Sequence, residues 1–498
     1  MSAIPVLTLE ELRGVEQRAA AQGVRLMERA GQALARAAAA IVRDNGAPVL
    51  VVAGPGNNGG DAWVAAAQIQ ESFHRVVVLD AAGTEPPAAE ARAARERFKA
   101  HAGEIVREWP RELRASLIVD GLLGIGLSRD VDDEFAAIIG RMNASGTAIL
   151  AIDVPSGLDS SSGRIRGAAV RATDTLTFIA HKPGLHTADG LDCVGHLECD
   201  DLGAQTWIGD AKGSLLEPGI VRDWLSPRPR NAHKGDFGTL SVIGGNRGMV
   251  GAALLAATAG LLCGAGKVRV GLLAADAPAV DPAHPELMLA SVDDAMDADV
   301  VVAGPGAGQS PSATSVSMFE RTVLPALLHR AGPLVLDADA LNAIAFSEAL
   351  ENAVCARTEG PTILTPHPGE AARLLHRTTL EIGEDRVGAA VALARRYRAH
   401  VVLKGAGSVC ASPNGRWSIN TTGNAGLASG GTGDVLAGMI GALLAQKLAP
   451  RQALDYAVCL HGAAADACVE RGIGPAGLTA TEVALEARRL LNDWSRKI

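Results

Sequence analysis

An alternation of short apolar segments with longer helical patterns constrains the fold of this chain more than any other feature. In the first part of the sequence, apolar runs at 49–53, 76–79, 117–119 and 148–152 are separated by helix-compatible stretches. Strands that are covered on both faces are apolar throughout, and parallel neighbours need a crossover between them. The pattern therefore predicts an α/β fold with a mainly parallel sheet, whose ligands bind at the carboxyl ends of the strands.

Two helices are predicted around the first of these strands. The Ala-rich amphipathic stretch from about Thr8 to Val42 is typical of one long helix. A further helix is expected from about Asp61 to Phe73, after the loop that follows the strand. Both helices would cover the sheet of the first segment.

A proline-containing stretch divides the pattern into two segments. The 498 residues exceed what one ordinary core holds. Between Lys212 and Asn231 the sequence has three prolines and no sustained period, which is typical of a linker, and the alternation restarts afterwards. We therefore expect one domain at 1–215, a linker at 216–230 and a second α/β domain at 231–498.

Charge and composition limit the classes of function. The formal net charge of −9 argues against non-specific binding to nucleic acid. No run of about 18 residues is apolar enough for a membrane span, and the first residues lack the basic region of a signal peptide. The seven cysteines form no Cys-x-x-Cys pair and are expected to be reduced. We expect a cytoplasmic protein without a nucleic-acid or membrane partner.

A glycine-rich turn before a helical pattern forms the strongest candidate site. The polar stretch 420–424 leads into Gly430-Gly-Thr-Gly-Asp434, and the apolar pattern of 435–444 follows at once. Such a turn points backbone N–H groups and the positive end of the helix dipole at one spot, where a phosphate can bind. Asp434 would lie beside the phosphoryl groups and take a proton from an attacking hydroxyl. A plain turn is the alternative, but the aspartate favours a small-molecule kinase or a relative of one.

A second candidate site follows the strands of the first segment. The loop from Ala53 to Asp61 contains four glycines and opens a helix, but it does not fit Gly-x-Gly-x-x-Gly. Asp120 and Asp153 each follow an apolar strand directly. Together with Asn58 and Ser156 from neighbouring loops, they would form an oxygen-rich cavity suited to a hard monovalent or divalent cation.

The motifs of the two segments together resemble a known two-domain family. They are, in order, Asn57-Asn-Gly-Gly-Asp61, Asp120-Gly-Leu-Leu-Gly-Ile-Gly126, Asp153-Val-Pro-Ser-Gly157, His233-Lys-Gly-Asp-Phe-Gly238, His367-Pro-Gly-Glu370 and the turn that ends at Asp434. This order resembles the bifunctional NAD(P)H-hydrate repair enzymes, which join an NAD(P)H-hydrate epimerase to an ADP-dependent NAD(P)H-hydrate dehydratase. The resemblance implies an N-terminal Rossmann-like three-layer α/β/α sandwich and a C-terminal ribokinase-like α/β domain.

The resemblance also implies two linked reactions. The first domain would interconvert the R and S forms of NADHX and NADPHX at C6 of the nicotinamide ring. The second would dehydrate the S form to NAD(P)H at the expense of ADP, giving AMP and phosphate. The resemblance further implies a potassium ion (K⁺) in the first domain and Mg²⁺ in the second. We also expect a homo-oligomer.

Site residues of the first domain follow from the same resemblance, position by position. Asp153 would be the acid/base of the epimerase. Potassium would bind to Asn58, Asp120 and Ser156. The hydrated dinucleotide would contact Asp153 and two loops, which comprise Asn57, Asn58, Gly59, Gly60, Asp61, Gly124, Ile125, Gly126, Leu127, Ser128, Arg129 and Asp130.

Site residues of the second domain are implied in the same way. Asp434 would bind the hydrate and deprotonate its reacting hydroxyl. Further contacts to the hydrate are implied for Ala253, Gly306 and His367. The adenine nucleotide would be held by Lys404, Gly405, Ala406, Gly407, Ser408 and Gly433.

Two alternatives remain open from the sequence. A ribokinase-like sugar or vitamin kinase with an accessory binding domain would share the glycine turn and Asp434. The first domain could instead be a non-catalytic scaffold, because related folds serve in protein interaction. The motif that begins at His367 favours repair over an ordinary kinase, and Asp120 and Asp153 argue against a scaffold.

Overall fold

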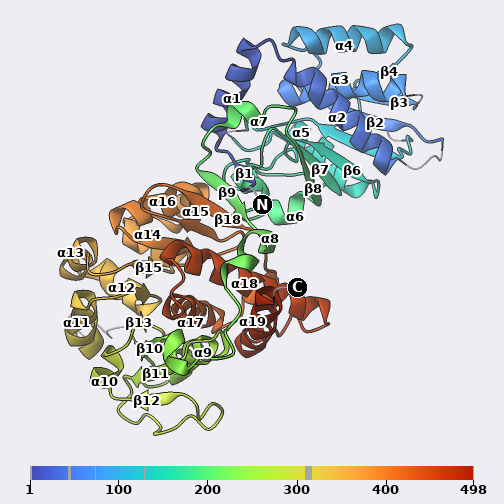
Figure 1. Ribbon diagram of the computed structural model, residues 1–498. Helices are drawn as coiled ribbons and strands as arrows, with labels where there is room; N and C mark the ends of the chain where they lie inside the picture. The colour runs from blue at the N-terminus through green and yellow to red at the C-terminus, as the bar shows by residue number, and fades with distance from the viewer. Residues whose placement is uncertain are drawn as a thin grey trace. The chain divides into compact units, whose positions relative to one another are not determined.

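The computed structural model describes residues 3–42, 46–72, 74–110, 112–127, 129–308 and 317–496. The chain divides into two units, Ile4–Ser214 and the residues from Leu215 onward. In Figure 1 each unit contains a sheet with helices packed around it. The hydrophobic clusters of the two units share no residue, so each unit has a core of its own.

The first unit is a parallel sheet covered by helices on both faces. Its strands lie in the order β4-β3-β2-β5-β6-β7-β8 and are parallel to their neighbours. Alternate strand residues face two different clusters, one formed with α1 to α4 and the other with α5. This arrangement confirms the predicted three-layer α/β/α sandwich. Its elements are β1 (Pro5–Val6), α1 (Leu9–Ala21), α2 (Leu26–Ile41), β2 (Val49–Ala53), α3 (Asn57–Glu71), β3 (Val76–Asp80), α4 (Ala89–Ala100), β4 (Glu104–Val106), β5 (Leu117–Gly121), α5 (Asp133–Ala144), β6 (Ile149–Ile152), β7 (Asp174–Phe178), α6 (Gly190–Cys193), β8 (His196–Asp200) and α7 (Gln205–Ile208).

Two of the predicted helices need correction. The stretch from Thr8 to Val42 is not one helix, because α1 ends before Gly23, whose φ is +74°. The N–H of Val24 donates to the carbonyl of Ala19 at 3.1 Å, which closes the helix end in a way that favours glycine at the left-handed position. The second helix, predicted from Asp61, begins four residues earlier at Asn57; its predicted end at Phe73 lies outside the described residues.

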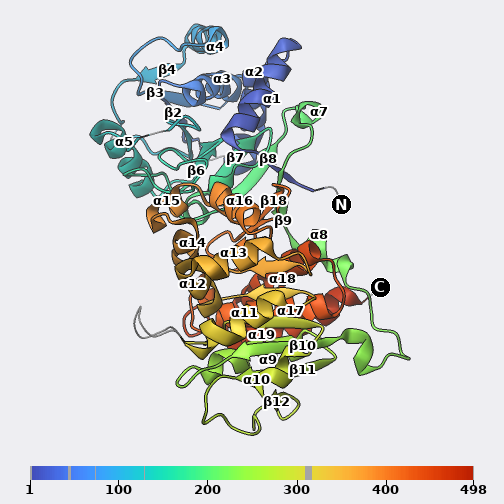
Figure 2. The ribbon, with the colours of Figure 1, turned by 90° about the vertical axis from the view of Figure 1, so that its left-hand side faces the viewer.

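The second unit is built on a longer mixed sheet. Its strands lie in the order β18-β17-β16-β15-β14-β13-β10-β11-β12. In this order the strands from β16 through to β12 are parallel to their neighbours, whereas β17 is antiparallel to both β16 and β18. Helix α17 is buried along almost its whole length and packs against α9, α18 and the sheet (Figure 2). Its first turn is therefore held firmly by the core.

Most elements of the second unit follow the predicted alternation, but β17 and β18 come after β16 with no helix between them and were not predicted. After β9 (Gly213–Leu216) they are α8 (Pro218–Val221), η2 (Arg222–Trp224), η3 (Lys234–Phe237), β10 (Thr239–Gly244), α9 (Val250–Leu262), β11 (Lys267–Leu272), β12 (Met288–Ala290), α10 (Val292–Met296), β13 (Val300–Ala303), η4 (Phe319–Val323), α11 (Leu324–His329), β14 (Leu334–Leu336), α12 (Asp339–Phe346), α13 (Glu348–Ala356), β15 (Thr362–Leu364), α14 (Pro368–Leu375), α15 (Thr379–Glu384), α16 (Arg386–Arg396), β16 (His400–Leu403), β17 (Val409–Ala411), β18 (Trp417–Asn420), η5 (Ala425–Leu427), α17 (Thr432–Ala445), α18 (Pro450–Glu470) and α19 (Ala480–Ser495).

Part of the stretch interpreted as a linker is folded. Residues 216–230 include α8 and η2, and Leu216 and Val221 are buried in the core of the second unit. The three prolines therefore accompany short helices as well as the loop that follows. The domain bounds given above stay a prediction.

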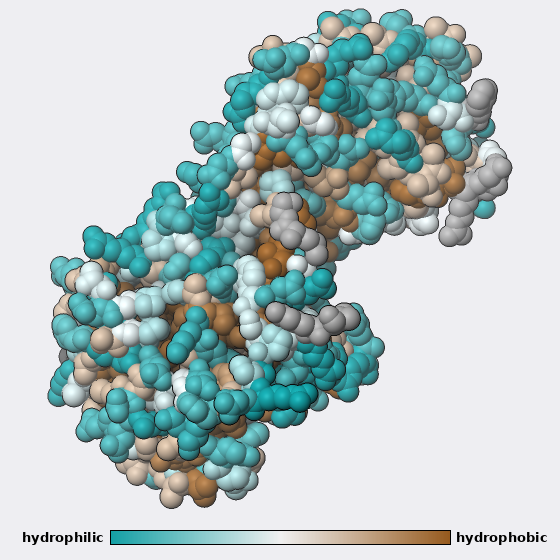
Figure 3. Space-filling view, viewed as in Figure 1, coloured by the Kyte–Doolittle hydropathy of each residue, from teal (hydrophilic) through white to brown (hydrophobic). Residues whose placement is uncertain are grey.

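Eight large apolar side chains are exposed in the described part of the chain. Figure 3 shows mostly hydrophilic residues on the face that it presents. Among the described residues, no helix has the length and apolar character that crossing a membrane requires.

Candidate active sites

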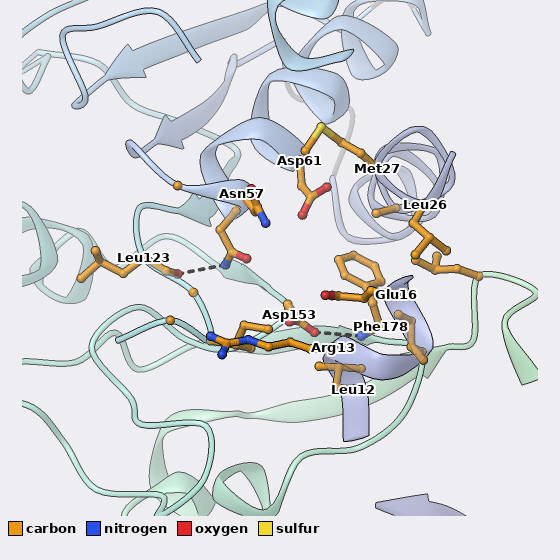
Figure 4. Close-up of a pocket in the computed structure, with 18 of the residues that line it drawn as sticks. Leu12, Arg13, Glu16, Leu26, Met27, Asn57, Asp61, Leu123, Asp153 and Phe178 are labelled. Atoms are coloured by element: carbon orange, nitrogen blue, oxygen red, sulfur yellow. Dashed lines mark hydrogen bonds between the residues drawn. The ribbon is translucent and has the colours of Figure 1, made fainter. Parts of the chain in front are cut away.

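A cavity of about 870 Å³ lies in the first unit at the carboxyl ends of β2, β5 and β6. Helices α1, α2 and α3 form other parts of its wall (Figure 4). Its polar lining comprises Arg13, Glu16, Arg25, Asn57, Asn58, Asp61, Glu90, Arg129, Asp153 and Lys182. The cavity lies where the predicted parallel sheet should bind its ligand.

The glycine loop after β2 is shaped by contacts with the protein itself. A Cβ atom on Gly59 would lie 1.8 Å from the carbonyl oxygen of Gly54, so the first turn of α3 needs glycine there. Asn58 Nδ2 donates to the carbonyls of Leu123 at 2.9 Å and Ile152 at 2.7 Å. The side chain of Asn58 thus ties the start of α3 to the ends of two strands.

Asp120 and Ser156 form a buried pair beside this loop. The Ser156 hydroxyl donates to Asp120 Oδ1 at 2.6 Å, and the Ser156 N–H donates to Oδ2 at 2.8 Å. Burial raises the pKa of the Asp120 carboxyl to about 6, although these hydrogen bonds oppose the rise. In the part of the chain that the structure describes, no cationic side chain forms an ion pair with this carboxylate.

Asp153 is held in an unusual position at the end of β6. Its φ is +63°, a left-handed conformation that costs a non-glycine residue roughly 1–2 kcal/mol. Its Oδ1 accepts from the N–H of Phe178 at 3.0 Å, from Thr177 Oγ1 at 3.1 Å and from Lys182 Nζ. The fold thus bears a conformational cost to fix one oxygen of this carboxylate, as is common at functional sites.

The structure reveals site residues that the sequence analysis missed. Lys182 is buried, and besides Asp153 it donates to Thr177 Oγ1 at 2.8 Å and to the Phe178 carbonyl at 2.9 Å. Glu16 reaches the cavity from α1, and burial followed by the charge of Asp153 raises its pKa. Lys182 follows β7, which pairs in parallel with β6 and was not among the predicted strands.

The predicted dinucleotide residues divide into three groups. Those that line the cavity are Asn57, Asn58, Asp61, Gly124, Ile125, Gly126, Leu127, Arg129 and Asp153. Gly59, Gly60 and Asp130 are not among the lining residues. Gly60 instead packs under Met27, because a Cβ atom there would lie 2.7 Å from Met27 Cε. Ser128 lies outside the described residues.

A second cluster of charged side chains lies at the first turn of α17. Asp434 extends from this turn, and Lys404 follows β16. Lys404 Nζ donates to Asp337 Oδ1 at 3.0 Å, and a Cβ atom on Gly433 would lie 3.3 Å from Nζ. The structure therefore brings Lys404 and the glycine turn together, as the sequence predicted.

Burial and the acidic neighbours of Asp434 raise its pKa. Burial, followed by the charge of Asp337, raises the pKa of Asp434 to about 7, although Lys404 opposes the rise. Asp339 and Glu370 contribute smaller effects in the same direction. A carboxylate with this pKa can accept a proton efficiently near neutral pH.

His367 is the N-cap of α14 at the edge of the same cluster. Its Nδ1 accepts from the N–H of Gly369 at 3.0 Å, while its own N–H donates to Glu370 Oε2 at 2.8 Å. Burial raises the pKa of Glu370 to about 7. The ring is about half exposed, so His367 can contact a ligand while its backbone is fixed by Glu370.

Of the remaining predicted residues, Gly306 lies in the loop after β13 and Ala253 lies in α9. The N–H of Asn246 donates to the carbonyl of Gly306 at 2.7 Å, which joins the loops after β10 and β13. Ala253 is buried in α9, where it packs against Gly245 of the same loop. Ala253 therefore supports the loop after β10 through packing from α9.

The predicted nucleotide loop, Lys404 to Ser408, is supported by a residue that sequence reasoning missed. Arg386 is buried at the start of α16 and donates to the carbonyls of Ala406 and Lys404. Ser408 Oγ donates to the Gly405 carbonyl at 3.1 Å. Arg386 thus fixes the shape of this loop from inside the protein.

Comparisons with known proteins cover both units. A model of the NAD(P)H-hydrate dehydratase family matches residues 240–487, and one described as YjeF-related protein N-terminus matches residues 23–184. The bifunctional NAD(P)H-hydrate repair enzyme Nnr of Escherichia coli (strain K12) is 39% identical over 456 residues, which are 89% of this chain and 85% of the relative. The protein of the same name from Coxiella burnetii is 38% identical over 496 residues, 97% of this chain and 98% of the relative.

A solved structure matches the second unit. The ADP/ATP-dependent NAD(P)H-hydrate dehydratase from Bacillus subtilis, co-crystallised with ATP and Mg²⁺, is 32% identical; the match covers 56% of this chain and 98% of that one, with a TM-score of 0.48. The curated relatives span both units and do not favour the alternative of an ordinary kinase. They confirm the resemblance found in the sequence: this chain belongs to the family of bifunctional NAD(P)H-hydrate repair enzymes.

Proposed function

We propose that the chain repairs hydrated nicotinamide cofactors by two reactions, one in each unit. The first unit epimerises R- and S-NAD(P)HX at C6, and the second dehydrates the S form to NAD(P)H while ADP is converted to AMP and phosphate. Family membership supports both reactions. The observation that carries the proposal is Asp434, a carboxylate in the first turn of α17 with a pKa of about 7.

The dehydration needs a base for the C6 hydroxyl. Asp434 accepts its proton as the hydroxyl oxygen attacks the terminal phosphorus of ADP and AMP leaves. The C6–O bond of the resulting phosphate ester then breaks as the ring nitrogen lone pair forms an N1=C6 bond. Loss of a proton from C5 gives NAD(P)H, so the phosphate has served to remove the hydroxyl.

The nucleotide has a cationic and glycine-rich surface to bind. We assign the adenine nucleotide to Lys404, the loop up to Ser408 and Gly433, where a partly buried ammonium lies next to a helix N-terminus. In the described residues no cluster of three His, Cys, Asp or Glu side chains could hold a metal alone. Mg²⁺ fits such a site when phosphate oxygens complete its ligands, and it would neutralise phosphate charge.

Asp434→Asn tests the assignment of the second unit. Dehydration of S-NADHX should fall by about 10²–10⁴-fold, because the amide cannot accept the proton. Exchange between R and S should continue at the wild-type rate. Asp297→Asn changes a fully exposed aspartate of the same unit and is the matched control. Dehydration at the wild-type rate in Asp434→Asn would show that another group is the base.

The epimerase reaction is assigned to Asp153, with K⁺ at Asn58, Asp120 and Ser156. Amide, carboxylate and hydroxyl oxygens suit a hard cation, and the buried Asp120 carboxylate lacks a cationic partner in the described part of the chain. A cation there would supply fixed positive charge beside the cavity. Asp153 itself accepts from Lys182 and faces the cavity.

Replacing K⁺ by choline tests this cation site. The melting temperature of the first unit should fall by a few degrees, because a ligand that binds the native state stabilises it by mass action. Asp120→Asn should remove this dependence on K⁺. Equal melting temperatures in K⁺ and choline for the unmodified protein would rule the site out.

A further inference from the structure

A second carboxylate enters the cavity of the first unit opposite Asp153. Asp61 extends from the start of α3, and in Figure 4 its carboxylate points into the space above Asp153 and Glu16. The two aspartates come from different elements, a helix and a strand end. A ligand that fills the cavity would therefore meet one carboxylate on each side.

The two carboxylates differ in their partners. Asp153 Oδ1 accepts from three donors, one of which is the ammonium group of Lys182. Within the described residues Asp61 has no side-chain hydrogen bond and no ion pair. The fold fixes the position of the Asp153 carboxyl group through these donors, whereas Asp61 is left free to exchange a proton with a ligand.

The surroundings of Asp61 favour its protonated form. Burial and then the charges of Asp153, Glu16 and Glu90 raise its pKa well above the ordinary value. The cationic side chains of the cavity are Arg13 on α1, Arg25 before α2, Arg129 in the loop after β5, and Lys182. Of these, Lys182 is engaged with Asp153. Two carboxyl groups in one site with such different environments are suited to opposite roles in proton transfer.

Inversion at C6 by hydroxyl exchange needs two proton transfers on opposite faces of the ring. The leaving hydroxyl must gain a proton, and the entering water must lose one. We propose that Asp61 is a second catalytic residue of the epimerase, which donates the proton on one face while Asp153 accepts the proton on the other. This role rests on the proposed epimerase function.

The step balances without another reactant. The C6–O bond breaks as the proton of Asp61 makes the leaving group water, and the N1 lone pair forms N1=C6. Water then adds to C6 from the other face, N1 regains its lone pair, and the proton passes to Asp153. In the reverse direction the two aspartates exchange roles. Lys182 is a positioning residue that holds one oxygen of Asp153.

Asp61→Asn in the full chain tests the proposal. The kcat for R/S exchange should fall by about 10²–10⁴-fold, with little change in KM and no change in ADP-driven dehydration of S-NADHX. Asp61→Glu should recover part of the exchange because it restores an acid. Glu71→Gln, at the exposed end of the same helix, is the control with the same replacement of a carboxyl group by an amide.

Two further readouts separate catalysis from a structural role. In the wild-type protein, exchange should decrease at high pH as the donor loses its proton, and Asp61→Asn should lose this alkaline limb. In H₂¹⁸O each inversion should place one ¹⁸O atom at C6. Exchange within about threefold of the wild type in Asp61→Asn, a change in KM alone, or inversion without ¹⁸O would overturn the proposal. Absence of exchange in the wild-type protein would instead refute the epimerase function.

Discussion

The surroundings of one residue, Asp434, give a carboxyl group a pKa at which it can act as a base near neutral pH. Burial and then the charge of Asp337 raise the pKa of Asp434 to about 7, and Lys404, which also binds Asp337, limits this rise. The same lysine is placed to contact a phosphate. One cation therefore serves both the base and the nucleotide in the proposed reaction.

The pH dependence of dehydration follows from this pKa. A base must be ionised to act, so kcat/KM should fall about tenfold per pH unit below pH 7 and level off above it. Glu370 also has a pKa of about 7, and coupled groups share a titration. The acidic limb should survive in Glu370→Gln if Asp434 is the base. Loss of the limb in that variant would reassign it to Glu370.

Residues that follow a strand could be placed from the sequence, but their partners could not. Asp120, Asp153 and Asp434 lie at the predicted strand ends and helix start. Lys182 lies 29 residues beyond Asp153, and its contact depends on β7 pairing with β6. Such a pairing is a property of the sheet, and no local pattern encodes it. The roles assigned to the individual site residues stay predictions.

Helix α3 both packs closely against neighbouring backbone and contributes residues to the proposed epimerase site. Its first turn carries Asn58, whose side chain joins two strand ends, and Asp61, which faces the cavity. The close approach of Gly59 to Gly54 sets the position of this turn. Gly54, Gly59 and Gly60 of the loop thus act through packing within the protein, whereas Gly56 lines the cavity.

Gly59→Ala tests this view of the element. The added methyl group would lie 1.8 Å from a backbone oxygen, so α3 must shift and the first unit should lose about 3 kcal/mol of stability. Exchange should fall strongly while dehydration continues. In Gly140→Ala, on the exposed face of α5, nothing lies within 4 Å of the new Cβ, and stability should stay equal or rise. A Gly59→Ala protein with the wild-type melting temperature and exchange rate would contradict the packing argument.

The sequence predicted whether a segment is a helix or a strand better than it predicted where that helix or strand begins and ends. Strands β2, β3, β5 and β6 of the first unit were found from their apolar runs because burial on both faces leaves a strong signal, whereas β4, β7 and β8 were missed. The break at Gly23 was missed because the amphipathic pattern continues on both sides of it. The fold of α8 was missed because four residues are too few to show a period.

For the whole molecule, the main property is that each site is built within one unit. The cavity around Asp153 uses residues from Leu12 to Leu202, and the cluster around Asp434 uses residues of the second unit. Loss of one activity should therefore leave the other intact. The homo-oligomer and the cytoplasmic location expected from the sequence stay predictions.

Conversion of a mixture of R- and S-NADHX tests the central claim most directly. Full-length protein is incubated with the mixture, ADP and Mg²⁺, and NADH absorbance is followed over times in which a sample without protein shows little exchange. Wild-type protein should convert the whole mixture, whereas Asp153→Asn should stop near the S fraction. A wild-type reaction that stops at the S fraction, or an Asp153→Asn reaction that runs to completion at the wild-type rate, would contradict the assignment of the two reactions.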